Sequence, residues 1–571
     1  MRAALGRLRR AEFLEEQALF PEPAYGFRHS LTHDVAYGSL LHDRRRALHA
    51  RVLAALEELH AGELDEIAGP LAHHATHAER WAQAAHYARR AGLKSQANLS
   101  HRAAAGFFEQ ALAALAHLPD DDAHRALAVD LRDEMARVLV PSGEHPRIVA
   151  ILREAEVIAA GLEDHVRLAR TLALLCSAYS EIGNSAGALE AGNRAVALAE
   201  RVGTAESRVR ATYSLAGALR TVGEYRRAVL LLRESLILTA GDPSVETFGL
   251  TGAASVLTRG HLAWSLAELG EFHEAVERAE EAIGIAQIPG DAFTQAHAQL
   301  ALGGTLLRQG RLADAIPVLE LGLALSKDAP FLYPPIAGDL GVIYTRSGRA
   351  DAGVELIERA VAQAERMGRV GRLSLIVTHL GEAYLFAGRR GDAAIQAERA
   401  VRLAIDHGER GNEVYAERLV GLVAAEDDPP RVEVARHHLG AALTLAETLA
   451  MRPLVARCHL ALGRLARRLG EADTARAVTS TWPSHRSNRC RCGTGSTASS
   501  SSASARSEAG VTLTRLDSAR YRRTPWKNGG GVTVDIAGAS VPGVAPGTWE
   551  GVVWRFGWTR IERPGPFSDL S

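Results

Sequence analysis

Two histidines, His73 and His77, lie four residues apart in the segment LAHHATHAERW. On a helix this spacing puts both imidazoles on one face, where they can ligate a metal ion such as Zn²⁺. The chain has 23 histidines, however, and no third ligand accompanies this pair. We therefore interpret His73 and His77 as packed or solvated helix residues, interpret His29 and His33 as structural, and predict no metal site.

The cysteines are few and offer one further metal candidate. The Cys490-Arg-Cys492 sequence resembles half of a metal site, but no second pair of ligands accompanies it. The other two cysteines are Cys176 and Cys458, so the chain has only four in 571 residues. This number excludes a disulfide scaffold and favours a reducing, cytoplasmic location.

The lysines exclude one common nucleotide site. A P-loop needs a lysine directly after a glycine, since that lysine reaches the terminal phosphates. Lys94, Lys327 and Lys527 are the only lysines, and none of them follows a glycine. We therefore predict that the chain is not an enzyme and binds no cofactor. The basic run Arg44–Arg46 is interpreted as a solvated helix start, with phosphate contact as the alternative.

Composition indicates the class of fold. The chain is 47% hydrophobic but only 5% aromatic, and much of the apolar content is Ala and Leu, which favour helices. Its net charge is −1, so no global field attracts nucleic acid. No run approaches the roughly 20 apolar residues that a membrane span needs. An all-α protein that contacts neither membrane nor nucleic acid is expected.

An internal repeat organises most of the chain. The pattern has an apolar and a small residue, then an apolar residue or Tyr, then Gly and finally Ala, as in LAGALRTVGEYRRA and LGEAYLFAGRRGDA. Most of its glycines are about 40 residues apart, and Asp428 replaces one of them in a degenerate copy. The positions that define the repeat are Gly183, Gly223, Gly270, Gly310, Gly348, Gly388, Gly470, Ala228, Ala275, Ala315 and Ala393.

Each repeat position has a physical reason. The glycine takes the left-handed conformation that ends a first helix, and the alanine packs a second helix back onto the first. The small residue lets the second helix approach closely. One hairpin cannot bury its apolar face alone, so neighbours stack into a superhelix with a concave groove. The pattern resembles tetratricopeptide repeats, lengthened to about 40 residues, over residues 85–478. The resemblance implies an α-solenoid with a protein or peptide partner in its groove.

The segment from Tyr25 to Leu59 is distinct from the repeats. It resembles the end of the ATPase module of bacterial signal-transduction ATPases, which precedes their repeats. The residues that match this pattern are Phe27, His29, Leu31, Asp34, Ala36, Tyr37, Ser39, Leu40 and Leu41, followed by Arg44, Arg45, Arg46 and His49.

Segments such as LREAEVIAAGLED and MRPLVARCHLALGRL are similar to the C-terminal half of bacterial class III adenylate/guanylate cyclases with an ATPase and tetratricopeptide repeats. In that family the catalytic domains lie upstream, and we expect this chain to begin after them. The resemblance implies a regulatory repeat module without catalytic domains, and a cyclase or ATPase is a candidate partner.

The C-terminal part changes character twice. Residues 479–510 are Ser-rich and aperiodic, which predicts a disordered linker or coding sequence read out of frame. Residues 511–571 show β-type alternation and resemble the N-terminal part of the HutD/Ves family of cupin-like β-barrels. The residues that carry this resemblance are Pro525, Trp526, Lys527, Asn528, Gly529, Gly530, Gly531 and Thr533. Since only about a third of such a barrel is present, we expect this segment not to fold fully.

These observations divide the chain into residues 1–84, the helical remnant of the ATPase module; 85–478, the repeats; 479–510, the linker; and 511–571, the truncated β segment. The leading prediction is a protein-interaction and regulatory repeat module. Two alternatives remain: a HutD-like protein of histidine utilisation, acting through the tail, and the repeat arm of a transcriptional regulator.

Overall fold

The computed structural model describes residues 2–18, 24–98, 100–239, 247, 250, 252–287 and 292–471. The chain divides into two units, residues 1–494 and 495–571. The second unit, the predicted linker (479–510) and the HutD-like motif (525–533) lie outside the described residues.

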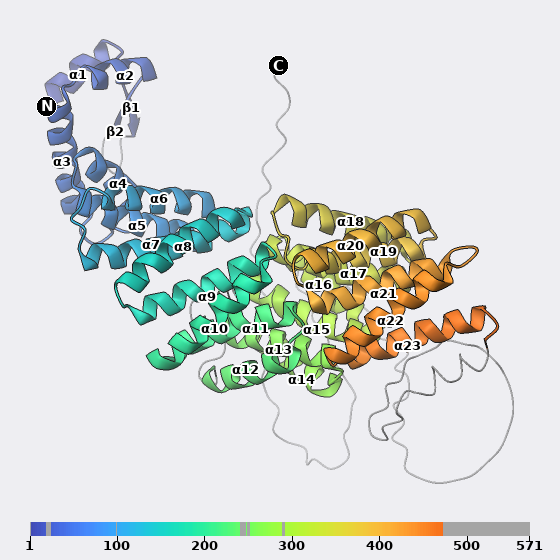
Figure 1. The fold of residues 1–571 in the computed structure, drawn as a ribbon. Coiled ribbons are helices and arrows are strands. Elements are labelled where there is room, and N and C mark those ends of the chain that lie inside the picture. Colours follow the sequence, from blue (N-terminus) through green and yellow to red (C-terminus); the bar gives the residue numbers. More distant parts are fainter. Residues whose placement is uncertain are drawn as a thin grey trace, which may run out of the picture. The chain divides into compact units, whose positions relative to one another are not determined.

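The described part is an all-α protein, as predicted, and consists almost entirely of helices (Figure 1). Its N-terminal elements are α1 (Arg2–Arg10), β1 (Leu14–Ala18), β2 (Ala24–Phe27), α2 (Ser30–Gly38), α3 (His42–Leu59), α4 (Ala68–His77), α5 (Trp81–Ala97), α6 (His101–Leu115), α7 (Asp122–Leu139), the 3-10 helix η1 (Val140–Ser142) and α8 (His145–Gly161). Strands β1 and β2 form an antiparallel hairpin in which Leu14 pairs with Phe27.

The helices that follow form antiparallel pairs, each with a first and a second helix. They are α9 (His165–Glu181), α10 (Ser185–Val202), α11 (Ala205–Thr221), α12 (Tyr225–Leu238), α13 (Ala254–Leu269), α14 (Phe272–Ala286), α15 (Ala292–Gln309), α16 (Leu312–Leu325), η2 (Pro330–Leu332), α17 (Tyr333–Arg346), α18 (Ala350–Arg366), α19 (Leu373–Phe386), α20 (Arg390–Asp406), α21 (Arg410–Glu426), α22 (Val432–Thr448) and α23 (Arg452–Arg468). Among the described helices, none has the combination of length and hydrophobicity needed to span a membrane.

Local sequence sets where many helices begin and end. The side chains of Asp121, Asp164, Asn184 and Thr204 accept backbone N–H groups in the first turns of α7, α9, α10 and α11. Each of the seven repeat glycines has a φ between +75° and +88° at the end of a first helix. The degenerate copy differs, since Asp428 lies between α21 and α22 without a positive φ.

Small residues set how closely the helices approach. A Cβ added to Gly303 would overlap the side chain of Leu319 on α16, and one added to Gly341 would overlap Ile357 on α18. The prediction that a small residue admits the second helix is therefore confirmed at these two pairs. The repeat alanines, which are Ala228, Ala275, Ala315 and Ala393, have no solvent exposure.

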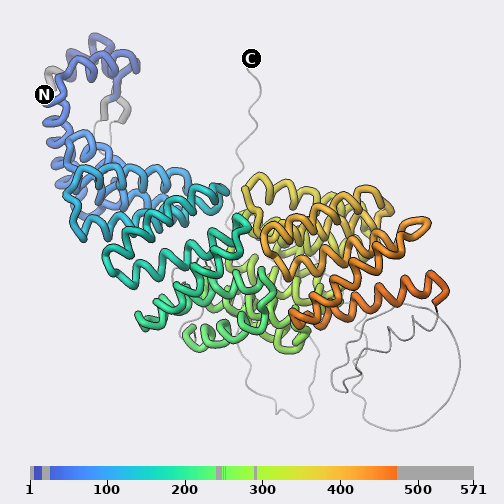
Figure 2. Tube along the Cα trace, in the orientation of Figure 1, coloured from blue at the N-terminus to red at the C-terminus, as the bar shows by residue number. Residues whose placement is uncertain are grey.

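The first helices form an inner layer and the second helices an outer one. Helices α9, α11, α13, α15, α17, α19 and α21 each pack against the next first helix, whereas α10, α12, α14, α16, α18, α20 and α22 pack chiefly against first helices (Figure 2). The inner helices are consequently buried on most sides. The outer helices bury one narrow stripe each and leave apolar residues such as Leu230 and Ile237 exposed.

The superhelix also packs against itself. The turn at the end of one helix contacts the turn at the end of the helix eleven further along the chain, and this spacing is the same at three successive places. In this way Gly143 meets Met367, Gly183 meets His407 and Gly223 meets Leu449, each too closely for a Cβ. By contrast, no atom lies within 4 Å of a Cβ built at Gly310, Gly348, Gly388 or Gly470.

Hydrogen bonds join the same turns. The carbonyl of Glu181 accepts the backbone N–H groups of Val370 at 3.0 Å and Gly371 at 2.9 Å. The Arg452 Nε donates to the carbonyl of Leu269 at 2.6 Å. Successive turns of the superhelix are therefore bonded to each other, which brings the inner faces of distant first helices together.

Candidate functional site

The two histidines of the predicted pair do lie close together, within a larger cluster. The rings of His73 and His77 are 4.2 Å apart, and His49 of α3 stacks on His77 at 4.9 Å. The Nδ1 atoms of His49 and His74 are 2.9 Å apart, and His49 Nε2 lies 2.9 Å from the Tyr37 hydroxyl. No group of three or more His, Cys, Asp or Glu residues in the described part has the geometry of a metal site.

This histidine cluster predicts a pH-dependent contact between α3 and α4. Burial, followed by the charges of His77, His74, His73 and Arg45, lowers the pKa of His49 to about 4, and burial also lowers the pKa values of His73 and His74. Since these pKa values are depressed by folding, the contact is fully stable above the unfolded value near 6.5. It weakens as the pH falls from there towards 4. Hydrogen exchange of α3 and α4 measured against pH checks this expectation.

The variant His49→Phe should flatten that pH profile, because it removes the central titrating group while keeping an aromatic ring. The matched control is His437→Gln, at an exposed position on α22, which should leave the profile unchanged. A profile that His49→Phe does not alter would contradict the prediction.

The other N-terminal candidates are held by local contacts. His29 is the residue before α2, and His33 bonds Asp34 at 3.0 Å. The Arg44–Arg46 run lies in the first turn of α3, where Arg46 pairs with Glu79 at 3.0 Å. Cys176 and Cys458 are free and buried, while Cys490 and Cys492 lie outside the described residues.

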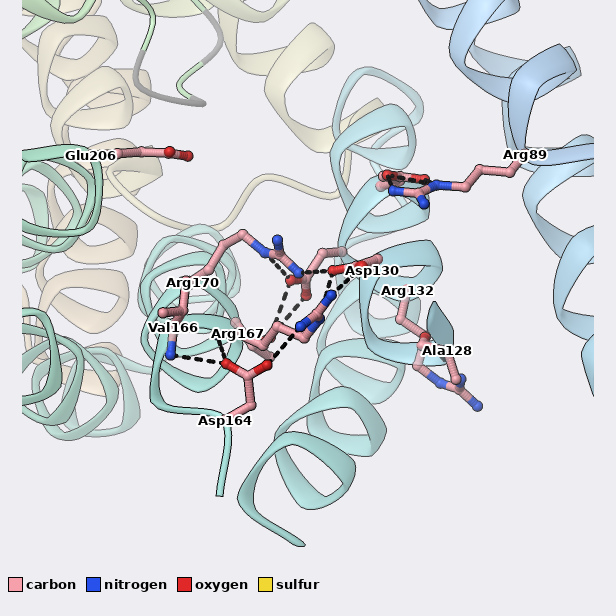
Figure 3. Close-up of polar contacts among 12 residues, drawn as sticks. Arg89, Ala128, Asp130, Arg132, Asp164, Val166, Arg167, Arg170 and Glu206 are labelled. Atoms are coloured by element: carbon pink, nitrogen blue, oxygen red, sulfur yellow. Dashed lines mark hydrogen bonds and ion pairs between the residues drawn. The ribbon is translucent and has the colours of Figure 1, made fainter. Parts of the chain in front are cut away.

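A ladder of ion pairs crosses the helices that precede and begin the repeats. Arg89 of α5 pairs with Glu134 of α7 at 2.6 Å, and Arg167 of α9 pairs with Asp130 of α7 at 2.9 Å (Figure 3). Arg170 bonds the buried Asp133 at 2.6 Å. In Figure 3 the side chains of Arg167 and Arg170 both reach from α9 towards Asp130.

The charges of this ladder are balanced. Nearby, Arg210 is buried and Arg137 is half-buried, and Glu206 pairs with Arg210 at 2.6 Å. The five arginines are Arg89, Arg137, Arg167, Arg170 and Arg210, and the five acids are Asp130, Asp133, Glu134, Asp164 and Glu206. Buried or half-buried pairs of this kind fix the register of neighbouring helices. The ladder is therefore structural.

A second polar group, the central inner cluster, lies on later first helices and on the segment between α18 and α19. It consists of Glu181, Arg220, Trp264, Glu268, Arg308, Asp339, Arg346, Arg369, Arg372, His379, Glu382, Arg418 and Arg457. The winding of the superhelix assembles it, because α11 packs on α21 and α13 packs on α23.

Each of the four carboxylates in this cluster already has a basic partner. Glu268 pairs with Arg308 at 2.5 Å and also accepts the Tyr415 hydroxyl at 2.8 Å. Glu382 pairs with Arg346 at 2.7 Å and with Arg418. The remaining contacts are Glu181 with Arg369 at 2.7 Å and Asp339 with Arg308 at 3.9 Å.

Three arginines of the cluster have no such partner. Within the described part of the chain, no carboxylate lies at ion-pair distance from Arg220, Arg372 or Arg457. Arg457 donates to the Arg308 carbonyl at 3.3 Å. Burial, and then the nearby Arg372, lower the pKa of Arg220 to about 9. Burial and Arg346 lower the pKa of Arg457 to about 10. The central inner cluster thus carries uncompensated positive charge.

Aromatic rings surround two of these arginines. The guanidinium carbons of Arg220 and Arg372 lie 4.6 Å and 5.8 Å from the centre of the Trp264 ring. His297 lies 5.0 Å from the same ring, and burial, Arg220 and Arg372 lower its pKa to about 3. His261 stacks on Tyr213 at 4.5 Å. Burial lowers the pKa of His261 as well, so both histidines are neutral at physiological pH and add no further charge.

A small pocket opens on one side of the cluster. Its lining includes Asp339, Arg369, Arg372 and His379, together with the apolar Ile376. Arg372 precedes α19 with a φ of +64°, a conformation that costs energy for a residue with a side chain. The fully buried Glu409 holds it there, since its carboxylate accepts the Arg372 backbone N–H at 2.6 Å.

The sequence analysis missed this cluster, although the repeat carries a signal for it. A charged residue lies two positions before four of the repeat glycines, at the C-terminal end of a first helix; these residues are Glu181, Glu268, Arg308 and Arg346. A charged residue recurring at a fixed repeat position indicates an inner face built for polar contacts. Arg220, Arg372 and Arg457 occupy other positions, so that signal does not find them.

Comparisons with known proteins cover both parts of the chain. Residues 518–571 match the HutD family model. The solved structure of a Rap protein complexed with competence and sporulation factor is 15% identical, covers 64% of this chain and 98% of its own, and has a TM-score of 0.47. The Rap conjugation gene regulator of the plasmid pLS20 with the Phr* peptide is 13% identical, covers 62% and 93%, and has a TM-score of 0.42.

A third structure is a STAND protein with a tetratricopeptide repeat sensor from Pyrococcus horikoshii, which is 14% identical, covers 62% of this chain and 53% of its own, and has a TM-score of 0.38. No curated protein matches the chain. The helix pairs, their left-handed glycines and the two-layered stack define this chain as a tetratricopeptide-like helical-repeat solenoid.

Proposed function

We propose that this chain is the partner-binding, regulatory repeat module of a bacterial signalling ATPase or nucleotide cyclase, without a catalytic domain of its own. The observation that carries the proposal is the central inner cluster. Charged and aromatic side chains gather there with more positive charge than the surrounding acids neutralise. A purely structural inner layer gains nothing from such an excess, because buried unpaired charge destabilises a fold.

The occupant we propose is a protein or peptide segment in the groove, with a cyclase or ATPase as the candidate assembly. The proposed location is the cytoplasm, with no membrane or nucleic-acid contact. The signalling assignment rests on the resemblance of the segment from Tyr25 to Leu59, which includes α2 and α3, to the end of such ATPase modules. The proposed division of the chain keeps residues 1–84, 85–478, 479–510 and 511–571 as separate segments.

Selection from a random peptide library on the full-length chain tests this function. Peptides that bind should protect backbone amides of the first helices α11, α13 and α15 from hydrogen exchange. The second helices α12, α14 and α16 of the same pairs serve as the internal control and should keep their exchange rates. Protection confined to the second helices, or the absence of any binder, would refute the proposed groove.

The match of residues 518–571 to the HutD model favours a second candidate function, in which the tail acts as a HutD-like protein of histidine utilisation. Limited proteolysis with mass spectrometry separates the two. We expect cleavage between residues 479 and 510 without a stable fragment of residues 511–571. Survival of that fragment would favour the second function.

A further inference from the structure

Two arginines without an ion-pair partner in the described part of the chain lie around Trp264. Arg220 projects from α11 and Arg372 from the start of α19, and both guanidinium groups lie against the Trp264 ring on α13. The Nε of Arg220 is buried and makes no hydrogen bond in the described part of the chain. Two guanidinium groups therefore lie against one ring without a carboxylate at ion-pair distance among the described residues.

Two features shape the surroundings of the ring. Position 304, on the neighbouring helix α15, is a glycine, and a Cβ there would lie only 3.2 Å from Trp264 Nε1 and 3.0 Å from Asp339 Oδ2. The buried Glu409 accepts the backbone N–H of Arg372 and holds that backbone at the edge of the pocket, which the Arg372 side chain helps to line. The point from which Arg372 projects is thus set ahead of binding.

The chemistry of the unpaired groups determines what fits. Two guanidinium groups that repel each other in a site with little solvent gain most from a shared oxyanion, which accepts from both forks at once. The neutral His261 and His297 and the ring of Trp264 add an apolar, aromatic wall. The ladder that crosses α5, α7 and α9 differs in charge, because its arginines and acids are equal in number.

We propose that Arg220, Arg372 and Trp264 form an oxyanion-binding site on the inner face of the superhelix, which takes a carboxylate or a phosphate group of the bound partner. This inference rests on the proposed binding role of the inner face and names the chemical group recognised there. Arg220 and Arg372 bind the anion, and Glu409 positions Arg372.

Isothermal titration calorimetry of the full-length chain tests the site, with inorganic phosphate in one arm and succinate in the other. Ionic strength is held constant with chloride, because screening alone changes the heats. We expect saturable binding at one site per chain, and the arm with the lower dissociation constant identifies the preferred group. The absence of saturable heat in both arms would overturn the site.

Variants give the test its specificity. Arg220→Gln and Arg372→Gln should each raise the dissociation constant by about tenfold or more, as the loss of one charge-assisted fork implies. The matched control is Arg349→Gln, which removes an arginine stacked on Tyr344 at 3.6 Å on the exposed surface and should leave binding unchanged. Equal weakening by the control, or no weakening by the two inner variants, would overturn the assignment.

A milder variant guards against misfolding. Arg220→Lys keeps the positive charge but loses the planar fork, so it should bind several-fold more weakly with unchanged helicity by circular dichroism. Unchanged binding by Arg220→Lys would count against recognition by the guanidinium fork.

If library peptides protect the first helices but neither anion binds, the site fails and the proposed function stands. If an anion binds but no peptide does, the site stands and the proposed peptide partner fails.

Discussion

Replacing Gly371 by alanine is expected to separate two turns of the superhelix. The backbone of Gly371 does not need a positive φ, but a Cβ there would overlap the carbonyl oxygen of Ser180. That oxygen belongs to backbone, which cannot rotate away as a side chain would. We expect G371A to lower the free energy of unfolding by about 1 to 3 kcal/mol, the usual cost of forcing atoms into a packed contact.

Hydrogen exchange locates this effect as well as measuring it. The amides of Val370 and Gly371 donate to Glu181 across the contact, so their exchange should accelerate in G371A before that of the helix interiors. The control is Gly391→Ala, at a glycine near the start of α20 that has open space around it. That variant should be neutral or stabilising by up to about 1 kcal/mol, because alanine favours helix. Equal stability of G371A and G391A would show that the turns are not in contact in solution.

Replacing Glu382 by glutamine is expected to be more damaging. The carboxylate bonds Arg346 and Arg418, and the side chains of Glu382 and Arg418 are 6% and 8% exposed. Glutamine keeps the shape but leaves two arginines without a counter-charge in a site with little water. Removing one partner of a buried ion pair typically costs about 3 to 5 kcal/mol, and we expect a loss of that order by chemical denaturation.

The same carboxylate predicts an acid sensitivity. Burial alone would raise the pKa of Glu382, but Arg346 and Arg418 more than offset burial and lower the pKa below its usual range. Because folding depresses this pKa, the stabilisation is complete above the unfolded value near 4.5 and is lost as the pH falls below it. The Glu382→Gln variant should therefore show a weaker loss of stability in acid than the parent chain.

The control for Glu382 is an exposed pair on α18. Glu355 lies 3.9 Å from Arg359, and their side chains are 71% and 62% exposed. Glu355→Gln should change the free energy of unfolding by less than about 0.5 kcal/mol, as is usual for surface pairs. A Glu382→Gln variant as stable as Glu355→Gln would mean that the central inner cluster is hydrated and loosely held.

The sequence predicts the repeat well because its rules are local. A glycine that ends a helix and an alanine that packs the next helix act within about 15 residues, so the roles of Gly223 and Ala228 can be predicted from the sequence alone. The candidate site is different. Arg220 and Arg372 lie 152 positions apart in the sequence, and only the winding of the superhelix brings both to Trp264.

The sequence also does not show which arginines form ion pairs with acids in the folded chain. The chain contains 66 basic and 67 acidic residues, so nothing in the composition marks the few arginines that lack a partner. Arg308 and Arg220 both lie near the C-terminal end of a first helix, yet Glu268 pairs with Arg308 and no carboxylate in the described part of the chain pairs with Arg220. Charge balance at a site is a property of the folded chain.

The contacts between superhelical turns affect how the protein is made. In a simple repeat array each unit touches only its neighbours, so folding can start anywhere and spread. Here the Leu269 carbonyl accepts a hydrogen bond from Arg452, and the Glu181 carbonyl accepts hydrogen bonds from residues 370 and 371, so each bond joins residues that are far apart in the sequence. Such distant contacts raise the contact order and slow folding. During synthesis the first turn of the superhelix is made while the carbonyls of Glu181 and Leu269 still lack these partners. The contacts between turns form only when the later helix pairs have been translated.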